Sequence, residues 1–98
     1  LLLELAEKGE QRAQFRIGIM YDFGDGVEQN FKKAVEYYKL AADQGNSSAQ
    51  CYLGLNYEYG KGVKKDYTKA FNYYSLSAEK GNSIAQCALG VCYFNGYG

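Results

Sequence analysis

Histidine is absent from this sequence of 98 residues, and cysteine occurs only three times. None of the cysteines forms a Cys-x-x-Cys pair, the spacing that zinc sites, haem attachment and redox dithiols commonly use. We therefore expect no metal and no cofactor. Cys87 and Cys92 lie five residues apart on one expected helix, so their side chains point in different directions and cannot easily form a disulfide. We expect these thiols and that of Cys51 to be reduced and buried.

Charge of one sign is not in excess either, because Lys plus Arg and Asp plus Glu both number 11. Phosphate backbones and anionic membranes attract basic proteins, so we do not expect nucleic acid as a partner. No apolar run is long enough to cross a bilayer, and Leu1, Leu2 and Leu3 are followed at once by Glu4, unlike a signal peptide. The chain opens without Met and begins and ends inside a repeat, so we expect the native termini to be missing. A cytoplasmic location is expected.

The sequence repeats itself with a period of 36 residues. Residues 13–48 aligned with 49–84 give 16 identities in 36 without a gap. We divide the chain into the end of a preceding repeat (1–12), two whole repeats (13–48 and 49–84) and the start of a truncated one (85–98).

Apolar residues at helical spacing predict two helices in each repeat. The expected ranges are 11–23, 30–44, 47–59, 66–80 and 83–95, with 1–8 as the end of an earlier helix. Four residues are expected to cap helix N-termini: Ser47 and Ser83, each with a Gln three residues later, and Asn30 and Asp66. Glycine pairs at 24 and 26 and at 60 and 62 are expected to end the first helices, because glycine adopts the left-handed conformation that such ends require. Val27 and Val63 should turn these loops inward.

The repeated residues resemble the Sel1-like repeat, a longer relative of the tetratricopeptide repeat. The pattern A-x-x-x-L-G-x-x-Y-x-x-G-x-G-V-x-x-D-x-x-K-A-x-x-Y-Y-x-x-x-A-x-x-G-N is matched throughout 49–82, and 13–46 departs from it only at Ile17 and Asn30. The resemblance implies an all-α fold, a right-handed superhelix (α-solenoid) of antiparallel helix pairs. It also implies an adaptor role, since the family has scaffolding members in ER-associated degradation, chitin-synthase regulation and bacterial signalling. Similar tyrosine-rich arrays accompany protein kinase domains.

Catalytic chemistry is not predicted. The glycines follow helices instead of opening one after a strand, unlike a phosphate-binding loop. Asp22 with Glu58, and Asp43 with Glu79, recur as surface positions where no second group is expected to converge, and without histidine no Ser-His or Cys-His nucleophile exists. Within the first helices, Gly18, Gly54 and Gly90 should mark close approach of a neighbouring helix. Most tyrosines are expected to fill the core between helices, with hydroxyls reaching the rim or a carbonyl. These are Tyr21, Tyr37, Tyr38, Tyr57, Tyr73, Tyr74 and Tyr93.

A second apolar stripe runs along the first helix of each repeat, at positions that line the concave face of tetratricopeptide arrays. We name it the concave stripe; it consists of Phe15, Ile19, Phe23, Cys51, Leu55, Tyr59, Cys87, Val91 and Phe94. A helix that is apolar on two sides is either buried on both or displays a patch for a partner. The sequence leaves both alternatives open: the stripe lines a groove, or superhelical curvature packs its side chains together. The flanking Asp22 and Glu58 would favour a partner segment with apolar anchors and a basic residue.

Two functions fit these observations. The first is a non-catalytic scaffold that binds segments of partner proteins on the concave face of a longer array. The alternative is a regulatory or docking segment of a larger enzyme such as a kinase, which a Lys and His-Arg-Asp pattern in the flanking frame would reveal. The resemblance also implies a third function, a stand-alone hydrolase like some cysteine-rich secreted relatives; these have paired cysteines in every repeat, and the first repeat here has none. Self-association through the truncated C-terminal repeat is also expected.

Overall fold

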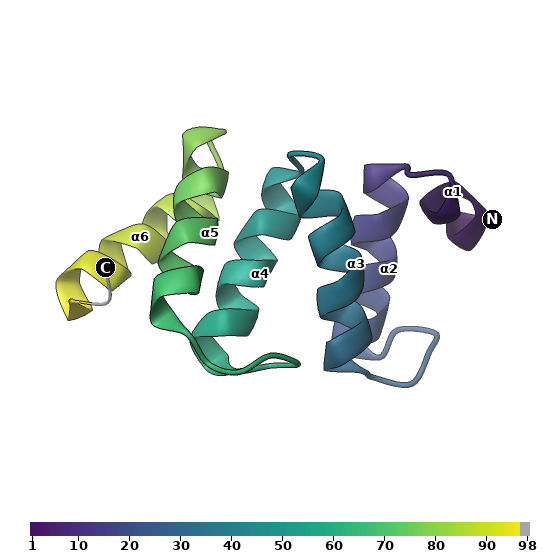
Figure 1. The fold of residues 1–98 in the computed structure, drawn as a ribbon, viewed down its shortest axis with the longest axis horizontal. Coiled ribbons are helices and arrows are strands. Elements are labelled where there is room, and N and C mark those ends of the chain that lie inside the picture. The colour runs from purple at the N-terminus through teal and green to yellow at the C-terminus, as the bar shows by residue number, and fades with distance from the viewer. Residues whose placement is uncertain (97–98) are drawn as a thin grey trace.

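The protein is a row of helices in which each one packs against the next in the chain (Figure 1). The computed structural model describes residues 1–96, with side chains for 1–91. Within this part there are six helices, α1 (Leu2–Glu7), α2 (Gln11–Phe23), α3 (Phe31–Asp43), α4 (Ser47–Tyr59), α5 (Tyr67–Glu79) and α6 (Ser83–Asn95). The helices from α2 to α5 run alternately in opposite directions, and the molecule is elongated, 42 × 25 × 17 Å. The predicted all-α solenoid is confirmed.

We call the two helices of one repeat a unit. The second helix of each unit begins where the sequence predicts. The side chains of Asn30 and Asp66 accept hydrogen bonds from the backbone N–H of Lys33 and Lys69, at 3.1 and 3.0 Å. Each cap satisfies one of the amide donors that a helix start leaves without an intrahelical partner. The first helices end on Gly24 and Gly60, both left-handed with φ of 67° and 68°, as expected.

The caps predicted at Ser47 and Ser83 are wrong by one residue. Asn46 caps α4, because its side chain accepts from the N–H of Ala49 at 2.9 Å, and Asn82 does the same for the N–H of Ala85. Both serines are instead the first residues of their helices. Asparagine is among the best capping residues, and it stands one position before the serine in both places.

The glutamines assigned to the capping box tie one unit to the next. Gln50 Nε2 donates to the carbonyl of Ala42, at the end of α3, at 3.3 Å, and Gln86 makes the equivalent bond to Ala78 at the end of α5. These carbonyls belong to the last turn of a helix, where four acceptors lack intrahelical partners. The repeated glutamine therefore closes the preceding helix instead of opening its own.

The core of each unit is centred on one tyrosine. Tyr38 and Tyr74 are fully buried, and their rings lie against Gly18 and Gly54. A Cβ at either glycine would be 2.5 Å from the Cδ1 atom of the facing ring, which confirms the predicted close approach. Gly90 has no such neighbour within 4 Å. The glycine pairs with the ring only where a second helix of the same unit is present.

Candidate functional site

The concave-stripe residues nearest the N-termini of α2 and α4, Phe15 and Cys51, are packed between units. Phe15 of α2 is half-buried and stacks on Tyr52 of α4, with ring centroids 5.6 Å apart and planes at 23°. The ring of Phe15 also lies 5.9 Å from that of Tyr38. Cys51, at the position equivalent to Phe15, is only 4% exposed. At this end of the stripe, packing prevails over a groove.

The other end of the stripe is open. Ile19 and Leu55 are half-buried and rest on the core, while Phe23 and Tyr59 are 64% and 62% exposed. The last repeat departs from this division: on α6, Cys87, equivalent to the buried Cys51, is exposed, and Val91 is 52% exposed. Phe94 lies outside the described side chains; the period of 36 also aligns it with Glu58, and Asn95 with Tyr59. Burial thus decreases along α2 and α4 toward the glycine turns.

The expectation that no group converges on Asp22 and Glu58 is wrong. The Tyr38 hydroxyl donates to Asp22 at 2.8 Å, and the Tyr74 hydroxyl donates to Glu58 at 2.7 Å. A fully buried phenol needs an acceptor, and the first helix of the same unit supplies it. The tyrosine hydroxyls therefore end on carboxylates and not on a carbonyl. These two acids therefore serve the fold, and one oxygen of each carboxylate is already occupied by a hydrogen bond.

The expectation of buried thiols holds for one of the two described cysteines. Cys51 is buried, and burial raises its pKa, which keeps the thiol protonated and unreactive. Cys87 is a free and exposed thiol. Cys92 lies outside the described side chains.

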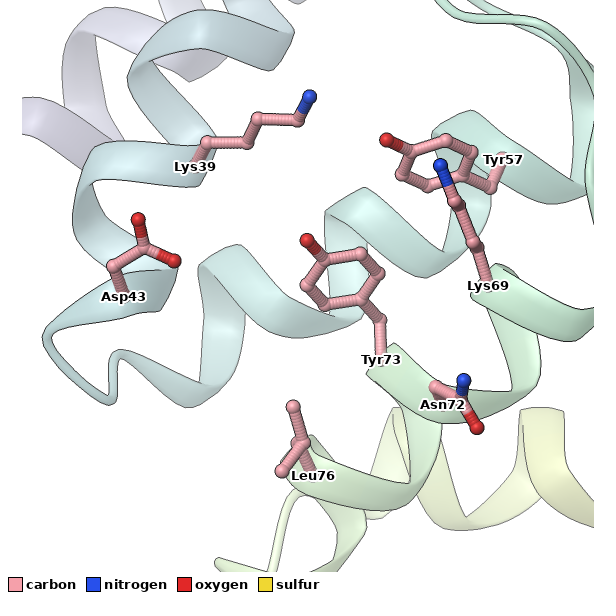
Figure 2. A pocket seen from close by; sticks show the side chains of 7 residues that line it. All are labelled: Lys39, Asp43, Tyr57, Lys69, Asn72, Tyr73 and Leu76. Carbon is pink, nitrogen blue, oxygen red and sulfur yellow. The ribbon is translucent and has the colours of Figure 1, made fainter.

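A cavity lies on the side of α4 that faces away from the concave stripe. It has a volume of about 560 Å³ and opens between α3 and α5 (Figure 2). We name it the outer cavity; its lining includes Lys39, Asp43, Tyr57, Lys69, Tyr73 and Leu76. Tyr57 and Leu55 are two residues apart on α4, hence about 200° apart around the helix, which places cavity and stripe on opposite faces.

Sequence reasoning did not identify the outer cavity, although one signal was present. The tyrosines of its floor were assigned to the core, which is correct for Tyr57, at 6% exposure. Tyr73 remains half-buried, and its ring stacks on that of Tyr57. A lysine recurs with this pair, since Lys33 and Lys69 are one period apart. Helical spacing alone does not show that the gap between two second helices is open.

Tandem helix pairs that bury their apolar faces only against neighbouring pairs define a class, the α-helical repeat proteins. The chain belongs to the Sel1 repeat family, whose model matches residues 11–46, 47–82 and 83–98. Proteins of this family are generally non-catalytic scaffolds for protein interactions. None of the described helices combines the length and the apolar character needed to cross a membrane.

Solved structures show the same fold. One is c5321, a protective antigen present in uropathogenic Escherichia coli strains and displaying an SLR fold, with 38% identity and a TM-score of 0.95 over 97% of this chain and 20% of that one. Another is a Sel1 repeat protein from Oxalobacter formigenes, with 37% identity and a TM-score of 0.88 over 97% of this chain and 39% of that one. The present chain thus spans well under half the length of either protein. No curated protein matched the sequence.

Proposed function

We propose that this protein is a non-catalytic scaffold that binds segments of partner proteins along the concave stripe of a longer array. The observation that carries the proposal is the exposure of Phe23 and Tyr59, two aromatic side chains one period apart, at 64% and 62%. Both stand at the end of a first helix, next to a glycine turn. Aromatic side chains are enriched at protein interfaces.

The half-buried Ile19 and Leu55 give these aromatic residues a rigid base, because both pack on the core clusters. A partner segment would insert apolar side chains between Phe23 and Tyr59 without ordering any part of the array. Anchors held this way commonly contribute about 2 kcal/mol or more when truncated. The alternative function, a docking segment of a larger enzyme, would use the same surface.

The test compares substitutions on the two faces. The variants Phe23→Ser and Tyr59→Ser remove exposed aromatic side chains, and Leu40→Ser, at a side chain 50% exposed on α3, is the matched control. Partners are captured from an extract of the source organism on the immobilised protein, and the Kd of each identified partner is then measured. We expect the two stripe variants to weaken binding about tenfold or more, and Leu40→Ser to have little effect.

The opposite pattern, normal binding by both stripe variants and loss with Leu40→Ser, would place the working surface on the second helices. Leu55→Asp is a less suitable variant, because Leu55 packs against the core and a buried charge would also destabilise the fold. Circular dichroism of each variant separates lost binding from lost structure.

A further inference from the structure

We propose that the outer cavity binds the carboxylate of an acidic segment from a partner protein. This site is separate from the concave stripe and lies on the opposite face. Its polar groups come from three helices: Lys39 and Asp43 from α3, Tyr57 from α4, and Lys69 from α5, joined there by Asn72 and Tyr73. Figure 2 shows Lys39 and Asp43 on one side of an open space and the hydroxyls of Tyr57 and Tyr73 on the other, with Lys69 over the Tyr57 ring.

Two phenols form the floor of the outer cavity. The rings of Tyr57 and Tyr73 stack with centroids 5.8 Å apart and planes at 8°, which holds both hydroxyls in fixed positions. Both hydroxyls point toward the gap between α3 and α5 (Figure 2). Neither has a hydrogen-bond partner among the described residues. Burial and the neighbouring Tyr57 raise the pKa of Tyr73, so its phenol stays a proton donor.

Two ammonium groups complete the donor set. Lys39 and Lys69 approach the Tyr57 ring from different helices, with Nζ atoms 6.0 and 5.4 Å from its centroid. These cation–π contacts orient the lysines. In the part of the chain that the structure describes, neither ammonium forms an ion pair. Four donors that lack an acceptor therefore meet in one cavity.

Charge and shape favour a carboxylate over other anions. Two lysines and Asp43 leave one net positive charge, which a single carboxylate neutralises. A phosphate dianion would keep excess negative charge beside Asp43, and like charges at this range repel each other. Leu76 at the edge of the cavity is 46% exposed and offers an apolar surface to a neighbouring side chain of the bound segment. An Asp or Glu flanked by an apolar residue fits both features.

The repeat supplies an internal control for this site. One period earlier, Tyr21 and Tyr37 stack in the same way, with centroids 6.0 Å apart, and Lys33 lies 5.3 Å from the Tyr21 centroid. The position of Lys39 is taken there by Leu3, so only one lysine is present. Both positions share the stacked tyrosines and one lysine, so this arrangement belongs to the repeat itself. The second lysine, Lys39, distinguishes the outer cavity from the equivalent position one period earlier.

The test is an NMR titration of the ¹⁵N-labelled protein with two blocked peptides, acetyl-Gly-Leu-Glu-Gly-amide and the same peptide with Gln for Glu. We expect the Glu peptide to shift the backbone amide signals of Tyr57, Asn72 and Tyr73, and the Gln peptide to bind about tenfold more weakly. The double variant Lys39→Met, Lys69→Met should abolish the shifts. Tyr73→Phe, which removes one hydroxyl and keeps the ring, should weaken them. Lys33→Met should leave them unchanged.

Three results would overturn the proposal. Equal shifts with the Glu and Gln peptides would mean that the cavity does not distinguish a carboxylate from a neutral amide. Loss of binding in Lys33→Met as large as in the double variant would mean that general surface charge is responsible. Shifts with inorganic phosphate but not with the Glu peptide would assign the site to another anion. Since Phe23 and Tyr59 are intact in all these variants, each result leaves the proposed concave-stripe function untouched.

Discussion

At the scale of the residue, Gly18 and Gly54 allow the two helices of a unit to approach. Glycine inside a helix is unfavourable by about 0.5–1 kcal/mol relative to alanine. The buried rings of Tyr38 and Tyr74 occupy the space where a methyl group would stand. The packed tyrosine offsets the propensity loss, and its hydroxyl reaches a carboxylate of the first helix.

Gly54→Ala and Gly90→Ala should therefore have opposite effects on stability. A Cβ at Gly54 would lie 2.5 Å from Tyr74 Cδ1, and overpacking of this kind costs about 1–3 kcal/mol. At Gly90 nothing lies within 4 Å, so alanine should stabilise by about 0.5–1 kcal/mol through helix propensity. Urea denaturation of both variants measures the difference. Equal midpoints would mean that the ring contact does not restrict this position.

Tyr38 should make the protein sensitive to alkali. Burial, and then the hydrogen bond to Asp22, raise its pKa well above the usual 10.0. Below pH 10 the folded and unfolded states both keep the proton; above it the unfolded chain releases the proton first, so stability falls as pH rises. Denaturation at a series of pH values from about 8 to 11 should show this fall, reduced in Tyr38→Phe. Tyr59→Phe, at a side chain 62% exposed, is the control and should keep the wild-type slope.

At the scale of the element, the helix ranges were predictable and the capping residue of α4 was not. The period of 36 is visible in the sequence itself, and the glycine turns and the Asn30 and Asp66 caps were predictable because each depends on residues near one another in sequence. Ser47 and Asn46 both suit an N-cap, and spacing to Gln50 favoured the wrong one. Gln50 instead binds the end of the preceding helix, a contact that no local pattern reveals.

Asn46→Ala should destabilise the protein by about 1 kcal/mol, because it removes the acceptor for the N–H of Ala49. Ser47→Ala should be nearly neutral: its described hydrogen bond to Ser77 uses the backbone carbonyl, which alanine retains. Thermal denaturation of the two variants distinguishes them. A larger loss of stability in Ser47→Ala than in Asn46→Ala would indicate that Ser47 is the residue that caps α4.

At the scale of the whole molecule, the candidate site divides into a predictable part and an unpredictable one. Apolar spacing located the concave stripe, but only the packing of neighbouring units decides that Cys51 is buried and Tyr59 exposed. The outer cavity needs residues of three helices in two units, among them Lys39 and Tyr73. The sequence of a single repeat therefore does not reveal the contacts between units.

One such contact is the turn around Gly62, which lies on the start of α3 in the preceding unit. A Cβ there would be 2.5 Å from the carbonyl carbon of Phe31 and 2.9 Å from the amide nitrogen of Lys32. The equivalent Gly26 has only the Met20 Cε atom nearby, at 3.9 Å. Lys61, beside Gly62, also lies over the Phe31 ring at 5.7 Å. The second turn thus joins two units; for Gly26, the positions equivalent to Phe31 and Lys32 precede residue 1 of the sequence.

Gly62→Ala and Gly26→Ala separate this contact from backbone strain, since φ is 75° and 77° at the two glycines. Both variants should lose stability through the unfavourable left-handed conformation, but Gly62→Ala should lose about 1–3 kcal/mol more because backbone atoms must move apart. Neighbouring units of a solenoid stabilise each other through such interfaces, so unfolding of Gly62→Ala should also become less cooperative. Urea titrations followed by circular dichroism report both the midpoint and the slope. Equal losses in the two variants, with unchanged slopes, would show that the turn contributes nothing to the coupling between units.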